Sequence, residues 1–379
     1  MNQDYQPTQG GPVTKLHFGY QDLFRSFRLG FSAKKLGMAL IGLLFGLVGY
    51  SGLSYLSYIT AGYDWLTIWQ LFRLLPLPMP DRYPWPWYSW FVYSLGLAWF
   101  LVVMLVTGTA LAKVTLEQLR GDEFYEARSA WRYALERAPT ILLSPLVLGA
   151  FIALIVALGL LLALIGLIPQ LGPFIVAIAA FPAWLAALLI LYLLIVLALT
   201  LILAPAIVAT TNSDTFDTLF EAFSCLNEQP GRTILYTATT AILAKIGGLL
   251  FGVAATIAGR IAYHILHPIL RDTLTDLLTN AASYLLITIP DRPPYALGHT
   301  LLRVTADHVW HLPQLYTPFT SMPTSWAIAI AGPLLSLTYY TISLLTIAYA
   351  LTTWHAGLTL TYITLAHKKD QRNLLTDTA

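Results

Sequence analysis

Histidines gather in one segment of the sequence and are its most specific chemical feature. Five of the eight histidines fall between residues 260 and 322, namely His264, His267, His299, His308 and His311. Two pairs within this set, in the sequences HILH and HVWH, have the i, i+3 spacing that lets two imidazoles on one helical face share a zinc or copper ion. Asp272 and Asp307 could be further ligands or could accept hydrogen bonds from the imidazoles. The alternative is a pair of amphipathic helices at a membrane surface in which histidine is a tolerated polar residue, because no cysteine or HExxH sequence accompanies the pairs.

Lys245 is the second residue that could do chemistry, because it is the only charge in the apolar stretch 233–259. An ionisable group inside a membrane span is by default a candidate site for an ion or a substrate. No acidic residue lies in any other apolar stretch to pair with it. The alternative is a lysine that extends its amine toward the cytoplasmic headgroups. His355, near the end of the last apolar stretch, lacks the second in-membrane histidine that a haem would need.

Long apolar helices must position these residues. The chain has 379 residues, of which 57% are hydrophobic and 11% are charged, against about 25% charged in soluble proteins. Asp, Glu, Lys and Arg are absent from 36–63, 83–112, 138–213 and 308–367. A span needs about 20 apolar residues, so the stretch 138–213 must fold back once, at the sequence IPQLGP. We expect an all-α membrane protein with about six transmembrane helices, at 36–60, 89–112, 140–167, 173–207, 233–258 and 325–350.

Basic residues predict the orientation of these spans. With six spans, fourteen of the twenty-one Lys and Arg residues fall on the side of both termini, which should therefore be cytoplasmic. The outer loop 76–90 then places its aromatic residues, Trp85, Trp87, Tyr88 and Trp90, at the headgroup level. The last apolar stretch continues to His367 and outruns a bilayer. We expect its final part, residues 352–369, to protrude or to lie along the interface.

Three amphipathic segments, 20–35, 122–139 and 213–230, each precede a pair of spans. Phe124 and Trp131 mark the apolar face of the second segment, and Phe216, Phe220 and Phe223 mark that of the third. The second and third segments align at a single offset, and the word GLLFG occurs in the first and fifth spans. These patterns predict an internal repeat in which interfacial helices, with aromatic stripes in the headgroup region, introduce helical hairpins. One continuous membrane domain would then hold three units, at 1–115, 116–211 and 212–379, the last with a long outer loop over 260–324.

One part of the chain resembles a known group of proteins. The sequence from EARSAWRYALERAPTILLSPLVLG to SDTFDTLFEAFSCLNEQPGRTILY is similar to uncharacterised bacterial inner-membrane proteins with an arginine-rich amphipathic helix, a double span and an SDxFDAxSRSFSYxxxRP-like segment. The resemblance covers roughly residues 115–260 and departs from the pattern at Cys225 and Glu228. It implies a bacterial cytoplasmic-membrane location and no activity. The layout is also loosely similar to that of sulfate permeases of the CysZ type, with no motif matched residue by residue.

Motifs of catalysis are absent from the sequence. It has no GxSxG, no GxxxxGK and no paired carboxylates within the apolar stretches, so we expect no enzymatic activity and no cofactor beyond the metal considered above. Without a basic and aromatic patch, nucleic acid is not an expected partner. We expect a non-catalytic subunit or assembly partner of a membrane complex; the alternative is a transporter or channel for a small solute or ion. Its partners would be the lipid bilayer and either another membrane protein or a second copy. Glycines at 42, 46 and 49, and at 247, 248 and 252, permit close helix contact, within the chain or between copies.

Overall fold

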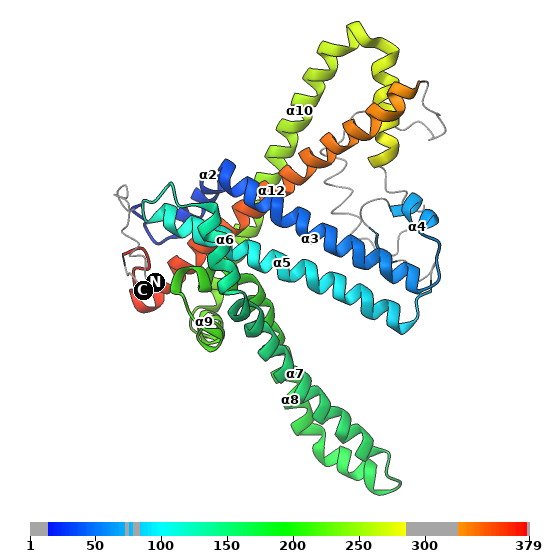
Figure 1. Ribbon diagram of the computed structural model, residues 1–379. Helices are drawn as coiled ribbons and strands as arrows, with labels where there is room; N and C mark the ends of the chain where they lie inside the picture. The colour runs from blue at the N-terminus through cyan, green and yellow to red at the C-terminus, as the bar shows by residue number, and fades with distance from the viewer. Residues whose placement is uncertain (1–13, 73–75, 79–83, 286–324, 377–379) are drawn as a thin grey trace, which may run out of the picture. The chain divides into compact units, whose positions relative to one another are not determined.

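The computed structural model describes residues 14–72, 76–78, 84–285 and 325–376, and these residues form helices joined by short connections (Figure 1). The helices are α1 (Tyr20–Leu23), α2 (Arg25–Gly30), α3 (Ala33–Thr60), α4 (Trp65–Phe72), α5 (Trp87–Leu119), α6 (Ala127–Glu136), α7 (Ala138–Gly166), α8 (Leu171–Thr211), α9 (Thr215–Glu228), α10 (Pro230–Leu285) and α12 (Trp326–Asp370). The described ranges contain no β-strand.

Six of the described helices are long and apolar enough to cross a membrane: α3, α5, α7, α8, α10 and α12. The prediction of an all-α membrane protein with about six spans is therefore confirmed. The helices run past the predicted spans, most of all α10 and α12. A helix ends where its backbone hydrogen bonds lose partners, and this point need not coincide with the end of its apolar stretch. The predicted spans therefore mark the apolar parts of longer helices.

The described residues group into two compact units, which we describe separately. Unit 1 draws on the described residues within Met1–Leu29, Leu105–Ala241 and Trp354–Ala379. Unit 2 draws on those within Gly30–Met104 and Ile242–Thr353. The boundaries between the units fall inside α2, α5, α10 and α12. The expected division into three hairpin units rests on the repeat and remains a prediction.

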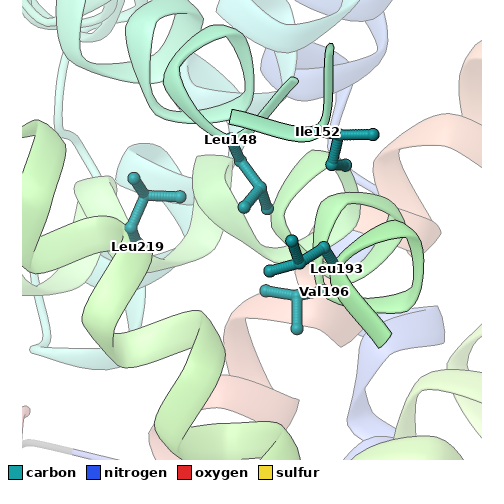
Figure 2. Packing of buried hydrophobic residues seen from close by; sticks show 5 residues of the cluster. All are labelled: Leu148, Ile152, Leu193, Val196 and Leu219. Atoms are coloured by element: carbon teal, nitrogen blue, oxygen red, sulfur yellow. The ribbon is translucent and has the colours of Figure 1, made fainter. Parts of the chain in front are cut away.

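In unit 1, α7 and α8 form an antiparallel hairpin (Figure 1). The sequence IPQLGP forms the turn, as predicted, and Gln170 takes a positive φ of 66° there. Gly172 is required in this turn, because a Cβ at that position would collide with the carbonyl oxygen of Gly166. The base of the hairpin is buried: Leu148 and Ile152 of α7 meet Leu193 and Val196 of α8, and Leu219 of α9 closes the cluster (Figure 2).

Helix α9 is the third amphipathic segment of the sequence. Asp214 caps its first turn by accepting a hydrogen bond of 2.9 Å from the backbone N–H of Asp217. Thr218, Ala222 and Cys225 are buried on one face, while Leu219 packs on the hairpin. Two adjoining faces of α9 are therefore covered by protein, and only the remaining arc is open to solvent or lipid.

The two other amphipathic segments are shorter than expected. The first is divided between α1 and α2, and α3 begins directly afterwards at Ala33. The second begins at Ala127, because the Asp122 carboxylate accepts the backbone N–H of Phe124 and holds the preceding residues in a turn. Tyr133 of α6 donates a hydrogen bond of 2.7 Å to the Val208 carbonyl, which fastens α6 to the end of α8.

In unit 2, close contacts at small residues pair the spans. Gly46 of α3 faces the Phe100 ring of α5, and Gly49 faces Trp99 so closely that no side chain would fit. Gly248 of α10 faces the Cβ of Ala350 in α12. The expected use of these glycines for packing within the chain is thus observed at each of these three positions.

An aromatic cluster caps the α3–α5 pair in unit 2. Tyr58, which is fully buried, packs on Phe72 of α4 and on Trp85, with ring centroids 5.6 and 4.7 Å apart respectively. The Tyr58 hydroxyl donates to the Leu77 carbonyl at 2.5 Å. Trp87, Tyr88 and Trp90 are exposed, as expected of residues at the headgroup level, whereas Trp85 belongs to the protein cluster.

The end of the last helix is buried by other helices of unit 1. Residues 354–370 of α12 belong to unit 1, where Ala356, Leu358 and Leu360 are fully buried. Thr361 of this segment lies 3.1 Å, hydroxyl to hydroxyl, from Thr240 of α10. Neighbouring helices of unit 1 therefore cover this segment. Whether it protrudes from the bilayer or lies along the interface stays a prediction.

Candidate functional site

A network of polar side chains joins the end of α12 to α9 in unit 1. The Lys369 ammonium lies 3.1 Å from the Glu221 carboxylate and 3.3 Å from that of Asp370, and it donates to the Ser224 hydroxyl at 3.1 Å. Ser224 in turn donates to Glu228 at 2.6 Å. Because Lys369 and Glu221 are both largely shielded from solvent, this ion pair fixes the end of α12 on α9 more firmly than an exposed pair would.

A polar hollow of about 500 Å³ opens beside this network. Its charged lining consists of three basic and three acidic residues, Arg137, Lys369, Arg372, Asp214, Asp217 and Glu221. Asn212, also in the lining, takes a left-handed conformation that turns the chain from α8 into α9. The charges balance, and two of the acids are already engaged, Glu221 with Lys369 and Asp214 with the α9 backbone. This balance of charge is suited to holding helices together. It is less suited to a site that needs an unpaired basic group for catalysis or unpaired cations to bind an anion.

Cys225, the single cysteine, lies buried beneath this network in α9. Its carbonyl accepts a hydrogen bond of 2.6 Å from the Thr233 hydroxyl at the start of α10. Burial, with a smaller contribution from Glu221, raises the pKa of the Cys225 thiol to about 12. The thiol therefore stays protonated at neutral pH and is a packing group.

His355 of α12 is buried in the core of unit 1. Its imidazole packs directly against Gly108 of α5, and its Nδ1 has no hydrogen-bond partner among the described residues. Sequence reasoning set this residue aside because a haem needs a second histidine nearby. Its close fit against a glycine is the feature that the sequence did not reveal, since residues 108 and 355 are far apart in the chain.

The candidate metal site is only partly within the described residues. His264 and His267 lie on α10, where the ring of Tyr263 contacts both imidazoles at centroid distances of 5.8 and 5.0 Å. His308 and His311 lie outside the described residues. In the parts of the chain that the structure describes, no three His, Cys, Asp or Glu residues come together as a metal site. The pairing of the two histidine pairs thus stays a prediction.

Lys245 lies on α10 with its side chain exposed. The residues beside it on the opposite side of the helix, Leu243 and Ala244, are buried. The lysine therefore lies on the exposed face of α10, next to the side that packs on α12.

The predicted interfacial aromatics fall into two groups. Phe216 and Phe220 of α9 are 59% and 69% exposed, and they remain available to a membrane surface. Phe223 instead packs on the hairpin, with its ring 6.1 Å from that of Tyr192. The predicted single stripe is divided because α9 lies against the base of the hairpin as well as at an open surface.

The equivalent residues of the second amphipathic segment also differ from each other. Phe124, 89% exposed, precedes α6 rather than lying on it. Trp131 is half-buried beside Arg128 and Arg132 in a shallow surface hollow.

The distal half of the α7–α8 hairpin, residues 153–192, is an uncovered apolar surface in unit 1, and we call it the arm. Apart from Gly172 in the turn, no residue of the arm is buried. Its side chains are almost entirely apolar, with Gln170 at the turn as a polar exception. Ala179, Ala183 and Ala187 recur at four-residue spacing on α8, and the last two are exposed. This small-residue spacing allows another helix to approach closely within a bilayer.

These features define the class of the protein. It is an all-α, multi-pass membrane protein in which an apolar helical hairpin packs at its base against a neighbouring helix. No protein-family model, curated protein or solved structure matches the chain. Sequence reasoning missed the Lys369–Glu221 pair and the exposure of the arm, because both depend on which helices become neighbours.

Proposed function

We propose that the protein is a non-catalytic subunit or assembly partner of a membrane complex in the bacterial cytoplasmic membrane, and that the arm is its docking element. The observation that carries the proposal is the exposure of the arm. In the most apolar stretch of α7, 6% of the residues are buried, whereas in that of α5 the share is 56%. A hairpin that the described part of its own chain covers so little, and that has small residues spaced for helix contact, is suited to packing on helices of another membrane protein.

Four buried threonine hydroxyls of unit 1 favour this role over transport. Thr109 and Thr115 of α5 donate to the carbonyls of Leu105 and Leu111 at 3.0 and 2.8 Å. Thr200 of α8 and Thr359 of α12 likewise bond within their own helices, each at 2.8 Å. A transport path needs polar groups that a solute can reach, and transporters often expose them at broken helices. These hydroxyls are already satisfied by the backbone.

The proposal is tested by replacing small residues of the arm with bulky ones, which blocks the close approach of a partner helix. The double substitution Ala183→Phe and Ala187→Phe alters exposed positions, so the chain should still fold, but a partner helix could no longer approach. Copolymer extraction from native membranes, followed by mass measurement of the particles, should show the unsubstituted 41.9 kDa chain in a larger protein assembly. The substituted chain should be recovered without that partner.

Leu185→Phe provides the control, because Leu185 is exposed on α8 and already large. It should leave the assembly unchanged. Recovery of the unsubstituted chain alone, or an assembly that is indifferent to bulk at 183 and 187, would contradict the docking role. Solute flux through liposomes that contain only this chain would favour the transporter alternative.

A further inference from the structure

Lys245 occupies the outward face of α10 in unit 2. Gly248, one turn further along, faces Ala350 of α12, which identifies the packed side of the helix. Ile242, Ile246 and Leu249 are 59%, 41% and 44% exposed. At about 100° per residue these three residues lie to one side of Lys245 on the exposed face, and Gly248 lies to its other side, so Lys245 is at the edge of that face next to α12. The lysine is thus the one charged residue on an otherwise aliphatic helix face that no described part of unit 2 covers.

The position of Lys245 in the sequence places it near the middle of a membrane span. The nearest charges along the chain are Arg232, thirteen residues before it, and Arg260, fifteen residues after it. At ~1.5 Å per residue these charges lie ~20 and ~22 Å away along the helix, so a hydrocarbon core of ~30 Å centred between them has Lys245 at its midplane. A lysine side chain reaches roughly 6 Å, which is less than half the distance to either surface.

This depth argues against a lysine that simply extends its amine to the headgroups. A protonated amine facing hydrocarbon at the midplane is unfavourable, and such groups usually pair within the membrane. Within the described ranges Lys245 makes no ion pair. A second copy of the chain cannot supply the acid, because no Asp or Glu occurs in 36–63, 83–112, 138–213, 233–259 or 308–367. Two copies meeting at this face would bring two lysines together.

We propose that Lys245 forms an intramembrane ion pair with an Asp or Glu in a transmembrane helix of a different protein, which packs on the face formed by Ile242, Lys245, Ile246 and Leu249. The inference rests on the proposed role as an assembly partner and adds the chemistry of one contact. The carboxylate balances the ammonium where lipid cannot, and the aliphatic residues supply the packing surface around the pair. The partner is thereby identified as a membrane protein with an acidic residue near the middle of a span.

A membrane-permeable carbodiimide tests the pair directly. Dicyclohexylcarbodiimide activates a carboxyl group in an apolar setting, and an adjacent lysine amine then forms an amide, while the reagent takes up the lost water as a urea. After treatment of native membranes with the full-length chain, peptide mass spectrometry should find Lys245 joined to an Asp or Glu in an apolar segment of another protein. An amide to the carboxylate of phosphatidylserine, or no amide at Lys245, would overturn the proposal.

Substitution gives a second test, with opposite outcomes for a paired and an unpaired lysine. Lys245→Leu should reduce co-extraction of the cross-linked partner at least tenfold, because the partner's carboxylate would be left without a counter-charge, while Lys245→Arg should retain most of it. Leu249→Met, on the same face, should have no effect. Unchanged or increased co-extraction for Lys245→Leu would mean that the lysine is unpaired. If Ala183→Phe with Ala187→Phe removes the partner while Lys245→Leu does not, the docking role is supported and the ion pair is contradicted. If neither variant removes the partner, both proposals are contradicted.

Discussion

The imidazole of His355 fills the space that a side chain at Gly108 would need. A Cβ at residue 108 would lie 2.8 Å from His355 Nδ1 and still closer to Cε1. Since the imidazole is itself buried, it has little room to move. This contact joins α5 to the final segment of α12, and it explains why two residues that are distant in the sequence constrain each other.

Gly108→Ala should therefore destabilise the protein by about 1–3 kcal/mol, the usual cost of overpacking a core. Thermal unfolding in detergent would show this as a lower midpoint. Gly149→Ala in α7 is the matched control, because nothing lies within 4 Å of a Cβ built there; it should be neutral or slightly stabilising. Adding His355→Ala to Gly108→Ala should recover part of the loss. Equal midpoints for the two alanine variants would contradict the packing account.

Two aromatic residues of α9 should respond differently to a charge. Phe223 packs on the base of the hairpin, so Phe223→Asp should destabilise the isolated protein by roughly 3 kcal/mol or more, in detergent as well as in membranes. Phe220 is exposed, so Phe220→Asp should change stability in detergent by less than about 0.5 kcal/mol. In cells it should lower the membrane level if Phe220 lies in the headgroup region. Similar losses for both variants in detergent would show that α9 is seated differently.

Glu221→Gln should have a modest effect on the same helix. It removes the charge that faces Lys369 but keeps an oxygen that can accept from it. A partly shielded pair of this kind contributes about 0.5–1 kcal/mol, which denaturant unfolding in detergent can measure. Glu221→Lys should be clearly worse, because it places a second cation against Lys369. A Lys variant as stable as the Gln variant would show that the pair does not hold α12.

The thiol of Cys225 gives a prediction about pH. Burial raises its pKa to about 12 from an ordinary value of 9.0. Between these values the unfolded chain loses a proton that the folded protein keeps, so stability should fall as pH rises above about 9, by up to ~1.4 kcal/mol per pH unit, and should be unaffected below it. The difference in unfolding free energy between the unsubstituted protein and Cys225→Ala isolates this thiol. A difference that stays constant from pH 8 to pH 11 would contradict its burial.

The sequence was sufficient to predict the helical class, the number of spans and the fold-back near Gln170, because these follow from uncharged length and from proline and glycine punctuation. It could not predict that the end of α12 is buried. An apolar stretch has the same sequence pattern whether lipid or protein covers it. Only the tertiary contacts determine which of the two covers it. The split of the α9 stripe has the same cause: Leu219 and Phe220 are adjacent and both apolar, yet one faces the hairpin and the other is open.

The orientation of the chain remains a prediction, and cysteine labelling tests it. In a Cys225→Ala background, Thr275→Cys should react with a membrane-impermeant maleimide added to intact cells, whereas Arg132→Cys should react only after the membrane is opened. Both residues are exposed, so access is not limited by the fold. Our expectation rests on the excess of Lys and Arg on the side of the termini. External labelling at residue 132 would show that the orientation is the opposite of the one we expect.

Photo-cross-linking from the arm in native membranes tests the central claim most directly. Benzoylphenylalanine at Trp184 and Leu191 would lie beside the open alanines of α8, and at Ile178 and Leu185 it would lie on other exposed positions of the same helix. A docking arm predicts protein adducts at Trp184 and Leu191, with lipid adducts prevailing at the other two. Lipid adducts alone at all four positions would show that the arm is an ordinary lipid-facing hairpin and would contradict the proposed role in assembly.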